Sequence, residues 1–391
     1  MGILPGLDIP SLENIREQAG LSSAQIAQLP VRILNVPGYA NLTDDGWNVL
    51  FHGQAYRQPL DNSSRLDRLA SGFLRGKVLS ALHPSQQEQA RNLTSAIYSL
   101  PVAGLPITMT VYNATGNDSP VVNVSLPFPT DVRGEFNDFW VNTSIFLVPR
   151  EGITFLADVD DVLRETRIFV PSAGLLDNSF VHPFTPWSNM PSVFSHWRQT
   201  IPSAHFHYLT TTPEPATRMY VEFVFGSYPL GSLDTRPYNF TTFDQTFRVR
   251  AVALRRALET FRQRKFVLMG DTANADVLRD YPQLAKEYGN VQASARPSTL
   301  DACLTRSLHS VHSHPQRIRD RWRGLPPVRH ERFAGLDKST YFFYRIPDDI
   351  MGLDIANGEC VNKSVPQHIE YGWQNLLRNP DHTRNWNGRK A

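Results

Sequence analysis

The 391-residue chain has few of the features that fix a protein class at once. It holds only two cysteines, Cys303 and Cys360, which excludes a disulfide framework. One bridge between them is open, and two unpaired thiols are the simpler expectation. A formal net charge of +2 gives no bulk electrostatic argument for nucleic acid as a partner. Apolar runs are short and interrupted, and the first residues lack a charged start followed by an apolar stretch, so neither a transmembrane helix nor a signal peptide is predicted.

The chain is rich in acceptor sites for N-linked glycans. Nine Asn-x-Ser/Thr tripeptides occur, at Asn41, Asn62, Asn92, Asn113, Asn117, Asn123, Asn142, Asn239 and Asn362. Their density favours a secretory or extracellular history. A cytoplasmic protein with a polar surface rich in Asn and Thr is the alternative, and a missing or trimmed leader would reconcile the secretory interpretation with the N-terminus.

The N-terminal half divides into two expected parts. Residues 1–44 are expected to form a helical segment, because residues 11–29 repeat apolar positions at helical spacing behind Ser11. Residues 45–149 are rich in short Val-, Phe- and Thr-bearing stretches bounded by turn formers. Such stretches predict a β-rich, sandwich-like domain, interrupted by one helix over residues 63–82.

Residues 150–297 have a different texture. Three apolar runs end in polar residues, at 153–160, 205–213 and 265–272, and a helix is expected over about 247–262. Buried strands that alternate with helices predict an α/β domain with an open parallel sheet, whose ligands bind beyond the carboxyl ends of the strands. Residues 298–391 form a C-terminal extension whose structure the pattern does not indicate.

Acids gather where the first of these strands ends. Asp158, Asp160 and Asp161 place three carboxylates in four residues, and they repel one another unless a cation lies between them. Asp271 ends the third predicted strand and Asp276 follows it. Oxygen ligands from two strand ends suit a hard metal such as Mg²⁺, and an Asx-turn or a helix cap is the structural alternative.

These segments resemble the haloacid dehalogenase superfamily and, more narrowly, the actin-patch-protein family of phosphatidate phosphatases. The family motifs DIDDTIKxT, PFxGMPxLY, FHYLSNSP, FPxGPLxLRDY and KFxLIGDSGQxD are matched in order by residues 158–166, 183–194, 206–213, 228–238 and 265–276. Arg296 falls where the family has the Arg of a later strand. The resemblance covers about residues 45–297 and implies a Rossmann-like haloacid dehalogenase-type fold for the catalytic domain.

The resemblance also implies roles for single residues. Asp158 would be the nucleophile and a metal ligand, and Asp160 the general acid and base, with its carbonyl on the metal. Thr210, with Thr211 beside it, would bind a phosphate oxygen. Asp271, supported by Asp276, would complete a Mg²⁺ site, and Arg236 would contact substrate.

The sequence departs from the family at the phosphate-binding lysine. That position falls at Arg250, which keeps the charge but replaces a compact ammonium by a planar fork. Val162 and the Thr210–Thr212 run also differ from the family residues.

The implied activity is hydrolysis of a phosphate monoester, with phosphatidate as the substrate. Two alternatives stay open: a phosphatase of another monoester, or a catalytically weakened adaptor. A basic run at residues 317–323 is either a solvated helix face or a contact for an anionic membrane surface.

Overall fold

The computed structural model describes most of the chain. The described residues are 10–60, 63–74, 76–103, 107–112, 120–126, 145–166, 176–236, 243–271, 275–291, 303–307, 333–344 and 346–365. The predictions made for Arg296 and for the basic run at 317–323 concern residues outside these ranges. No helix in this described part is long and apolar enough to cross a bilayer.

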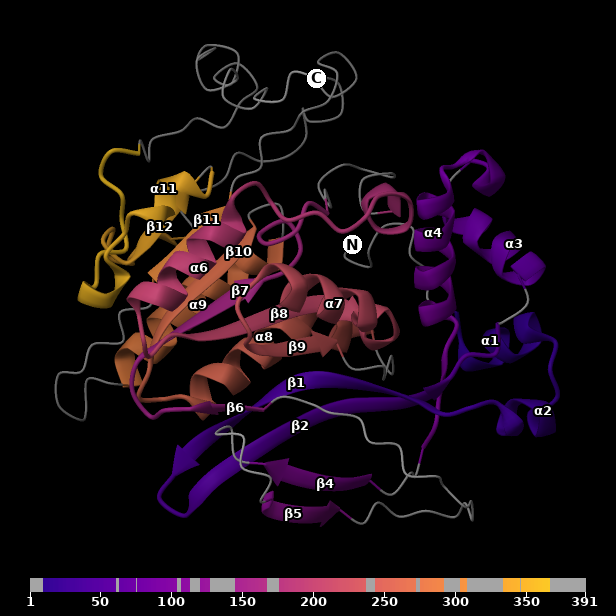
Figure 1. Cartoon of the computed structure of the whole chain (residues 1–391). Helices are drawn as coiled ribbons and strands as arrows, with labels where there is room; N and C mark the ends of the chain where they lie inside the picture. The colour runs from indigo at the N-terminus through magenta and orange to yellow at the C-terminus, as the bar shows by residue number, and fades with distance from the viewer. Residues whose placement is uncertain are drawn as a thin grey trace, which may run out of the picture.

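A six-stranded parallel sheet forms the centre of the molecule (Figure 1). Its strand order is β12-β11-β10-β7-β8-β9, and every neighbouring pair is parallel. The strands are β7 (Ile153–Asp158), β8 (His205–Pro213), β9 (Ser232–Arg236), β10 (Lys265–Asp271), β11 (Cys303–Ser307) and β12 (Tyr341–Tyr344). The three strands predicted from apolar runs are β7, β8 and β10, which lie side by side.

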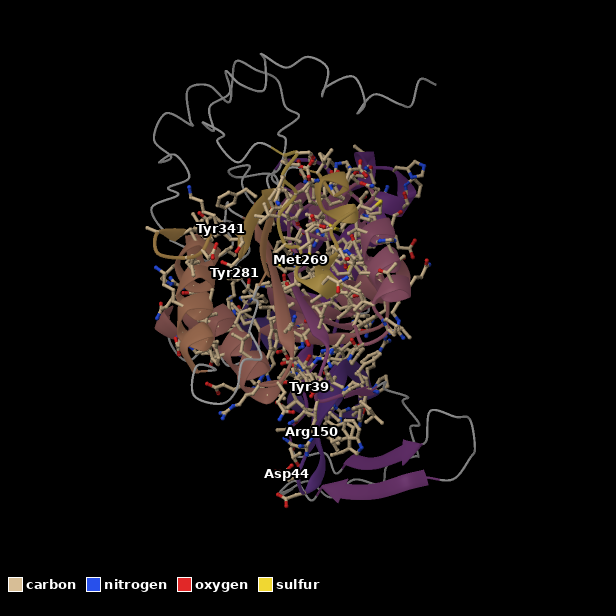
Figure 2. All side chains as sticks on the ribbon, turned by 90° about the vertical axis from the view of Figure 1, so that its left-hand side faces the viewer. Tyr39, Asp44, Arg150, Met269, Tyr281 and Tyr341 are labelled. Carbon is tan, nitrogen blue, oxygen red and sulfur yellow. The ribbon has the colours of Figure 1, made fainter. Side chains whose placement is uncertain are left out.

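Helices cover both faces of this sheet, which is why all of β7 is buried. Successive strand residues point to opposite faces, so Phe155 and Ala157 join one apolar cluster and Leu156 joins the other. The first cluster includes side chains of α6 (Met190–Thr200) and α7 (Thr217–Ser227). The second includes side chains of α8 (Phe243–Thr260) and α9 (Ala275–Val291). On α9, the Tyr281 hydroxyl donates to the carbonyl of Met269 on β10 at 3.2 Å (Figure 2).

The N-terminal region combines helices with a long hairpin. Gly20, with φ of 61°, ends α1 (Leu12–Ala19), so the single helix expected over 11–29 is two helices, the second being α2 (Ser23–Gln28). The hairpin β1 (Arg32–Thr43) and β2 (Gly46–Arg57) follows. The next elements are α3 (Ser63–Phe73), η1 (Leu79–Ala81), α4 (Pro84–Ile97) and β3 (Leu100–Pro101).

The sandwich expected over residues 45–149 is not confirmed. A four-stranded sheet has the order β3-β2-β1-β6, in which β6 (Ile145–Val148) runs parallel to β1. A separate hairpin, β4 (Ile107–Tyr112) with β5 (Pro120–Leu126), lies beyond β2 as seen from the parallel sheet (Figure 1). Strand β1 belongs to the segment 1–44 that was expected to be helical.

The parallel sheet continues past residue 297. Strands β11 and β12 come from the C-terminal extension, and Phe342, Tyr344 and Ile350 enter the apolar cluster under α6 and α7. Two short helices, α11 (Asp348–Met351) and η7 (Ile355–Asn357), follow. The expectation of two unpaired thiols is wrong, because Cys360 is disulfide-bonded, and Cys303 is the only other cysteine of the chain.

Candidate active site

Three neighbouring strands bring the predicted acids and hydroxyls to one edge of the sheet. Strand β7 lies between β10 and β8 and runs parallel to both, so the carboxyl ends of all three open on the same side (Figure 1). Met269 pairs with Ala157 and Leu209 with Asp158. Asp271 therefore leaves β10, and Thr210 leaves the paired part of β8, within about one residue of the level of Asp158.

Asp158 is fully buried and pairs with a buried guanidinium. Its Oδ2 lies 2.6 Å from Nη1 of Arg250 on α8, and Arg250 is 3% exposed. The Nε of the same guanidinium donates to Oδ2 of Asp276, at the start of α9, at 2.9 Å. One arginine thus spans the acid that ends β7 and the acid that opens α9.

The surroundings of Asp158 disfavour its charged form when no further cation is present. Burial raises the pKa of Asp158 to about 7, and the charge of Asp160 adds to this effect while Arg250 opposes it. Arg250 has a pKa well above its ordinary value, since Asp158 and Asp276 outweigh the effect of its burial.

Asp160 is 4% exposed and its carboxylate accepts several hydrogen bonds. On Oδ1, the hydroxyls of Thr166 and Tyr220 each donate at 2.8 Å. On Oδ2, Thr210 donates at 2.9 Å and Thr212 at 3.5 Å. This carboxylate therefore faces α7 and the end of β8, and it is the main-chain carbonyl of Asp160 that the family resemblance assigns to the metal.

The turn after β7 fixes this arrangement. Asp161 takes a φ of 60°, a left-handed conformation that Asp tolerates better than most residues. Its amide donates to the carbonyl of Arg164 at 3.0 Å, and its carboxylate accepts from the amide of Thr166 at 2.9 Å. The third acid of the cluster thus holds the loop, a role that the spacing of the acids left open.

The remaining predicted residues lie at the same edge of the sheet. Asp271 is 2% exposed at the end of β10, and Thr211 is half-buried at the end of β8. Arg236 ends β9, paired with Pro213, and burial lowers its pKa. Prediction from sequence missed Tyr220 and Arg164 as partners of Asp160; Arg164 lies inside the first motif, whereas no pattern marks Tyr220.

The donor set at this edge fits Mg²⁺. Among the described residues, no three His, Cys, Asp or Glu side chains gather as a metal site. Two carboxylates from adjacent strand ends, Asp158 and Asp271, are nevertheless what Mg²⁺ uses, because it keeps several waters and binds through one or two carboxylates plus substrate phosphate. Asp276, predicted as a further ligand, is occupied by Arg250 through one of its oxygens.

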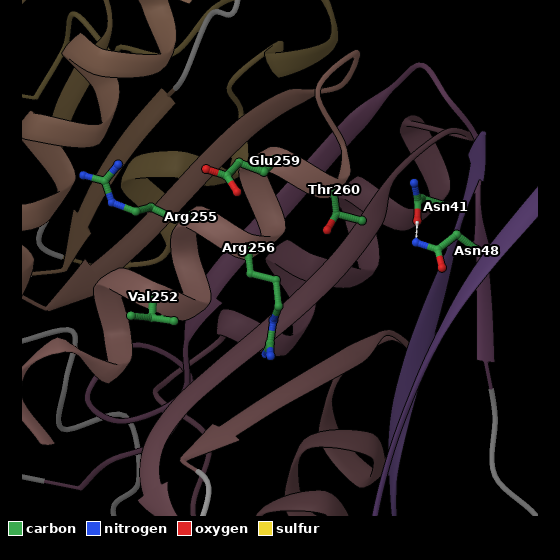
Figure 3. A pocket seen from close by; sticks show the side chains of 7 residues that line it. All are labelled: Asn41, Asn48, Val252, Arg255, Arg256, Glu259 and Thr260. Atoms are coloured by element: carbon green, nitrogen blue, oxygen red, sulfur yellow. Dashed lines mark hydrogen bonds between the residues drawn. The ribbon is translucent and has the colours of Figure 1, made fainter. Parts of the chain in front are cut away.

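A hollow elsewhere does not compete with this site. It has a volume of about 490 Å³ and is lined by Asn41, Asn48, Val252, Arg255, Arg256, Glu259 and Thr260, between the β1–β2 hairpin and α8 (Figure 3). Its two arginines already pair with carboxylates, Arg255 with Glu287 and Arg256 with Asp234. The hollow therefore offers little net positive charge to an anion.

Comparisons with known proteins find a family and a relative that are similar to the part of the chain that contains these residues. Residues 153–294 match the family described as phosphatidate phosphatase APP1, catalytic domain. The chain is similar to phosphatidate phosphatase APP1 of Saccharomyces cerevisiae, with 21% identity over 228 residues, which is 56% of this chain and 37% of the relative. The chain thus spans little more than a third of that protein. The matched segment runs from the start of β7 to just beyond α9 and contains every predicted site residue, so this part of the chain is similar to the catalytic domain of the phosphatidate phosphatase APP1 family.

Proposed function

We propose that this chain is a Mg²⁺-dependent phosphatase that hydrolyses a phosphate monoester through an aspartyl-phosphate, with phosphatidate as substrate and diacylglycerol as product. The observation that carries the proposal is the pairing of a fully buried Asp158 with Arg250 at 2.6 Å, at the edge where three parallel strands end. The match of residues 153–294 to the phosphatidate phosphatase APP1 catalytic domain supports the substrate class.

The residues divide the reaction between them. An oxygen of Asp158 attacks phosphorus, the bond to the alcohol oxygen breaks, and Asp160 gives that oxygen a proton. Water then attacks the phosphorus of the aspartyl-phosphate, Asp160 takes a proton from this water, and phosphate leaves as Asp158 is restored. Arg250 would bind a phosphate oxygen, and Thr210 would do so by turning its hydroxyl away from Oδ2 of Asp160, to which it donates at 2.9 Å. Bound Mg²⁺, held by Asp158, Asp271 and the carbonyl of Asp160, would offset the charge of the phosphate.

Phosphate release from a short-chain phosphatidate, with and without Mg²⁺, tests the proposal. We expect Mg²⁺-dependent release, and Asp158→Asn should abolish it while the variant stays folded. Asp44→Asn is the matched control, because this aspartate lies exposed at the β1–β2 turn. Full activity of Asp158→Asn would exclude Asp158 as the nucleophile.

Parallel assays with other monoesters separate the alternatives. Release from glycerol phosphate but not from phosphatidate would keep the chemistry and change the substrate. No release from any monoester, with Mg²⁺ present and the protein folded, would favour an adaptor.

A further inference from the structure

Tyr220 and Arg164 form a second layer behind Asp160. Tyr220 lies on α7 and is 3% exposed, and its hydroxyl donates to Oδ1 of Asp160 at 2.8 Å. The same hydroxyl accepts from Nη1 of Arg164 at 2.7 Å. This Nη1 lies 3.5 Å from Oδ1 of Asp160, so the guanidinium, the phenol and the carboxylate meet at one point.

Arg164 is itself held on several sides. It is completely buried, and its Nη2 donates to the carbonyl of Asn178 at 2.6 Å and to the hydroxyl of Ser179 at 2.9 Å. Its guanidinium also stacks on the ring of Phe184 at 3.5 Å. Residues 178 and 179 belong to the π-helical turn η2 (Asp177–Val181), which packs with the N-terminal helices in a common apolar cluster.

A fully buried cation is costly unless its partners compensate for lost water. Here its carboxylate partner is Asp160, the residue to which proton transfer is assigned. A carboxylate that must give and take a proton has to keep one orientation, and two further hydroxyls from Thr166 and Thr210 restrict it on the other sides.

We propose that Tyr220 and Arg164 are positioning residues that hold the carboxylate of Asp160 for proton transfer to the leaving alcohol. The inference rests on the proposed phosphatase function and extends it to residues that touch neither substrate nor metal. It predicts that loss of the Tyr220 hydroxyl slows cleavage of esters whose leaving group needs a proton. Cleavage of esters whose leaving group needs no proton should hardly slow.

The experiment compares two leaving groups in the full chain with Mg²⁺ bound. Short-chain phosphatidate releases an alkoxide-like oxygen that needs a proton, whereas 2,4-dinitrophenyl phosphate releases a stable phenolate that does not. For Tyr220→Phe we expect kcat on phosphatidate to fall about tenfold, the size of one hydrogen bond to a charged group. The pre-steady-state burst of dinitrophenolate and both KM values should change less than about twofold, because the hydroxyl contacts Asp160 rather than substrate.

Further variants separate positioning from stability. Tyr208→Phe is the control, because Tyr208 is equally buried and donates one hydrogen bond, to the carbonyl of Pro229 at 2.6 Å, away from Asp160. It should leave the ratio of the two rates unchanged. Arg164→Met should alter the ratio as Tyr220→Phe does, and Arg164→Lys should restore part of it. Asp160→Asn, which removes the proton-transferring group itself, should give the largest change in this ratio of rates.

The outcomes distinguish the two proposals. A wild-type chain that turns over neither ester overturns the proposed function. The positioning role is overturned if the wild-type chain turns over both esters and Tyr220→Phe slows the two reactions equally or not at all. The proposed phosphatase function stands in that case.

Discussion

At the scale of single residues, Arg250 compensates the charges of two carboxylates of the site at once. Its guanidinium contacts Asp158 through Nη1 and Asp276 through Nε. A planar fork can serve two carboxylates in fixed directions, whereas the ammonium of lysine is a compact point charge. The chain therefore keeps the cation that the family resemblance requires and adds a rigid link from β7 to α9.

Replacing Arg250 tests this link. Arg250→Lys keeps the charge but cannot bridge both acids, so we expect kcat/KM to fall about tenfold, the equivalent of one charged hydrogen bond. Arg250→Met leaves Asp158 buried without its counter-charge, which should abolish turnover and lower the free energy of unfolding by about 3 kcal/mol. Steady-state kinetics and urea denaturation measure the two effects. A methionine variant as active as wild type would exclude Arg250 from the site.

The residues of the site were predictable to different degrees. Asp158 and Asp160 stand out because two acids at a strand end repel each other unless a cation is near. Arg250 could be placed only by counting back along a family motif. Tyr220 was not predictable, since its role depends on the angle at which α7 crosses the sheet, and no local pattern records that angle.

At the scale of elements, a buried polar chain joins β8 to β9. His207 lies 3.1 Å from Oδ2 of Asp234, whose Oδ1 lies 2.8 Å from Arg256 of α8. Burial alone would raise the pKa of Asp234, but His207 and Arg256 outweigh it and lower the pKa to about 2. The edge strand β9 is thus fixed to the sheet and to a helix by one carboxylate.

Asp234→Asn should show what this carboxylate contributes. A pKa lowered by folding stabilises the folded state above the unfolded value of 3.8, and the contribution disappears as pH falls toward about 2. We expect the variant to lose about 3 kcal/mol of unfolding free energy at pH 7, as for a broken buried pair, and progressively less below about pH 4. Urea titrations at several pH values measure this, with Asp44→Asn as an exposed control. A loss independent of pH would assign the effect to packing.

Elements were predictable where the pattern of burial is regular. Strands β7, β8 and β10 are apolar runs that end in polar residues, as expected of central parallel strands. Strand β9 has the sequence SLDTR, whose Ser232 and Asp234 are buried by pairing with histidines of β8, so no apolar run marks it. The sheet could not be followed past residue 297 because β11 and β12 are short and far apart in sequence.

At the scale of the whole molecule, residues 150–297 are not a separate unit. Leu34, Val36 and Tyr56 of the hairpin join the apolar cluster on one face of the parallel sheet, and Tyr39 and Val148 join the cluster on the other. Two of the six strands of this sheet come from beyond residue 297. The boundaries expected from sequence at 150 and 297 therefore cut through shared cores.

A fragment of residues 150–297 tests this conclusion. It would lose β11, β12 and the side chains of the hairpin, and the apolar surface that they cover would be exposed to water. Each Å² of apolar surface exposed costs about 25 cal/mol of stability. We expect no cooperative thermal transition and rapid proteolysis, in contrast to the full chain. Calorimetry and limited trypsin digestion would show this, and a fragment that melts like the full chain would define an independent domain.

Covalent features of the whole chain favour the secretory interpretation over the cytoplasmic one. A disulfide at Cys360 is typical of oxidising compartments. Among the acceptor asparagines whose side chains the structure describes, Asn92 is exposed on α4, and Asn41 and Asn362 are half-buried, so Asn92 is the most accessible to modification. The disulfide and the acceptor sites are independent features, and both favour the secretory compartment.

Protein from its native source should therefore carry N-glycans. Treatment with an N-glycan-removing glycosidase should lower its mass, and Asn92→Gln should remove one glycan. Reduction should lower the melting temperature, because a bridge between positions 303 and 360 restricts the unfolded chain. This restriction adds about 4 kcal/mol to the free energy of unfolding. Cys360→Ser should melt like the reduced wild type, and reduction should not affect this variant. Unmodified asparagines together with two titratable thiols in the native protein would instead place the chain in a reducing compartment, as the resemblance to the actin-patch family alone implies.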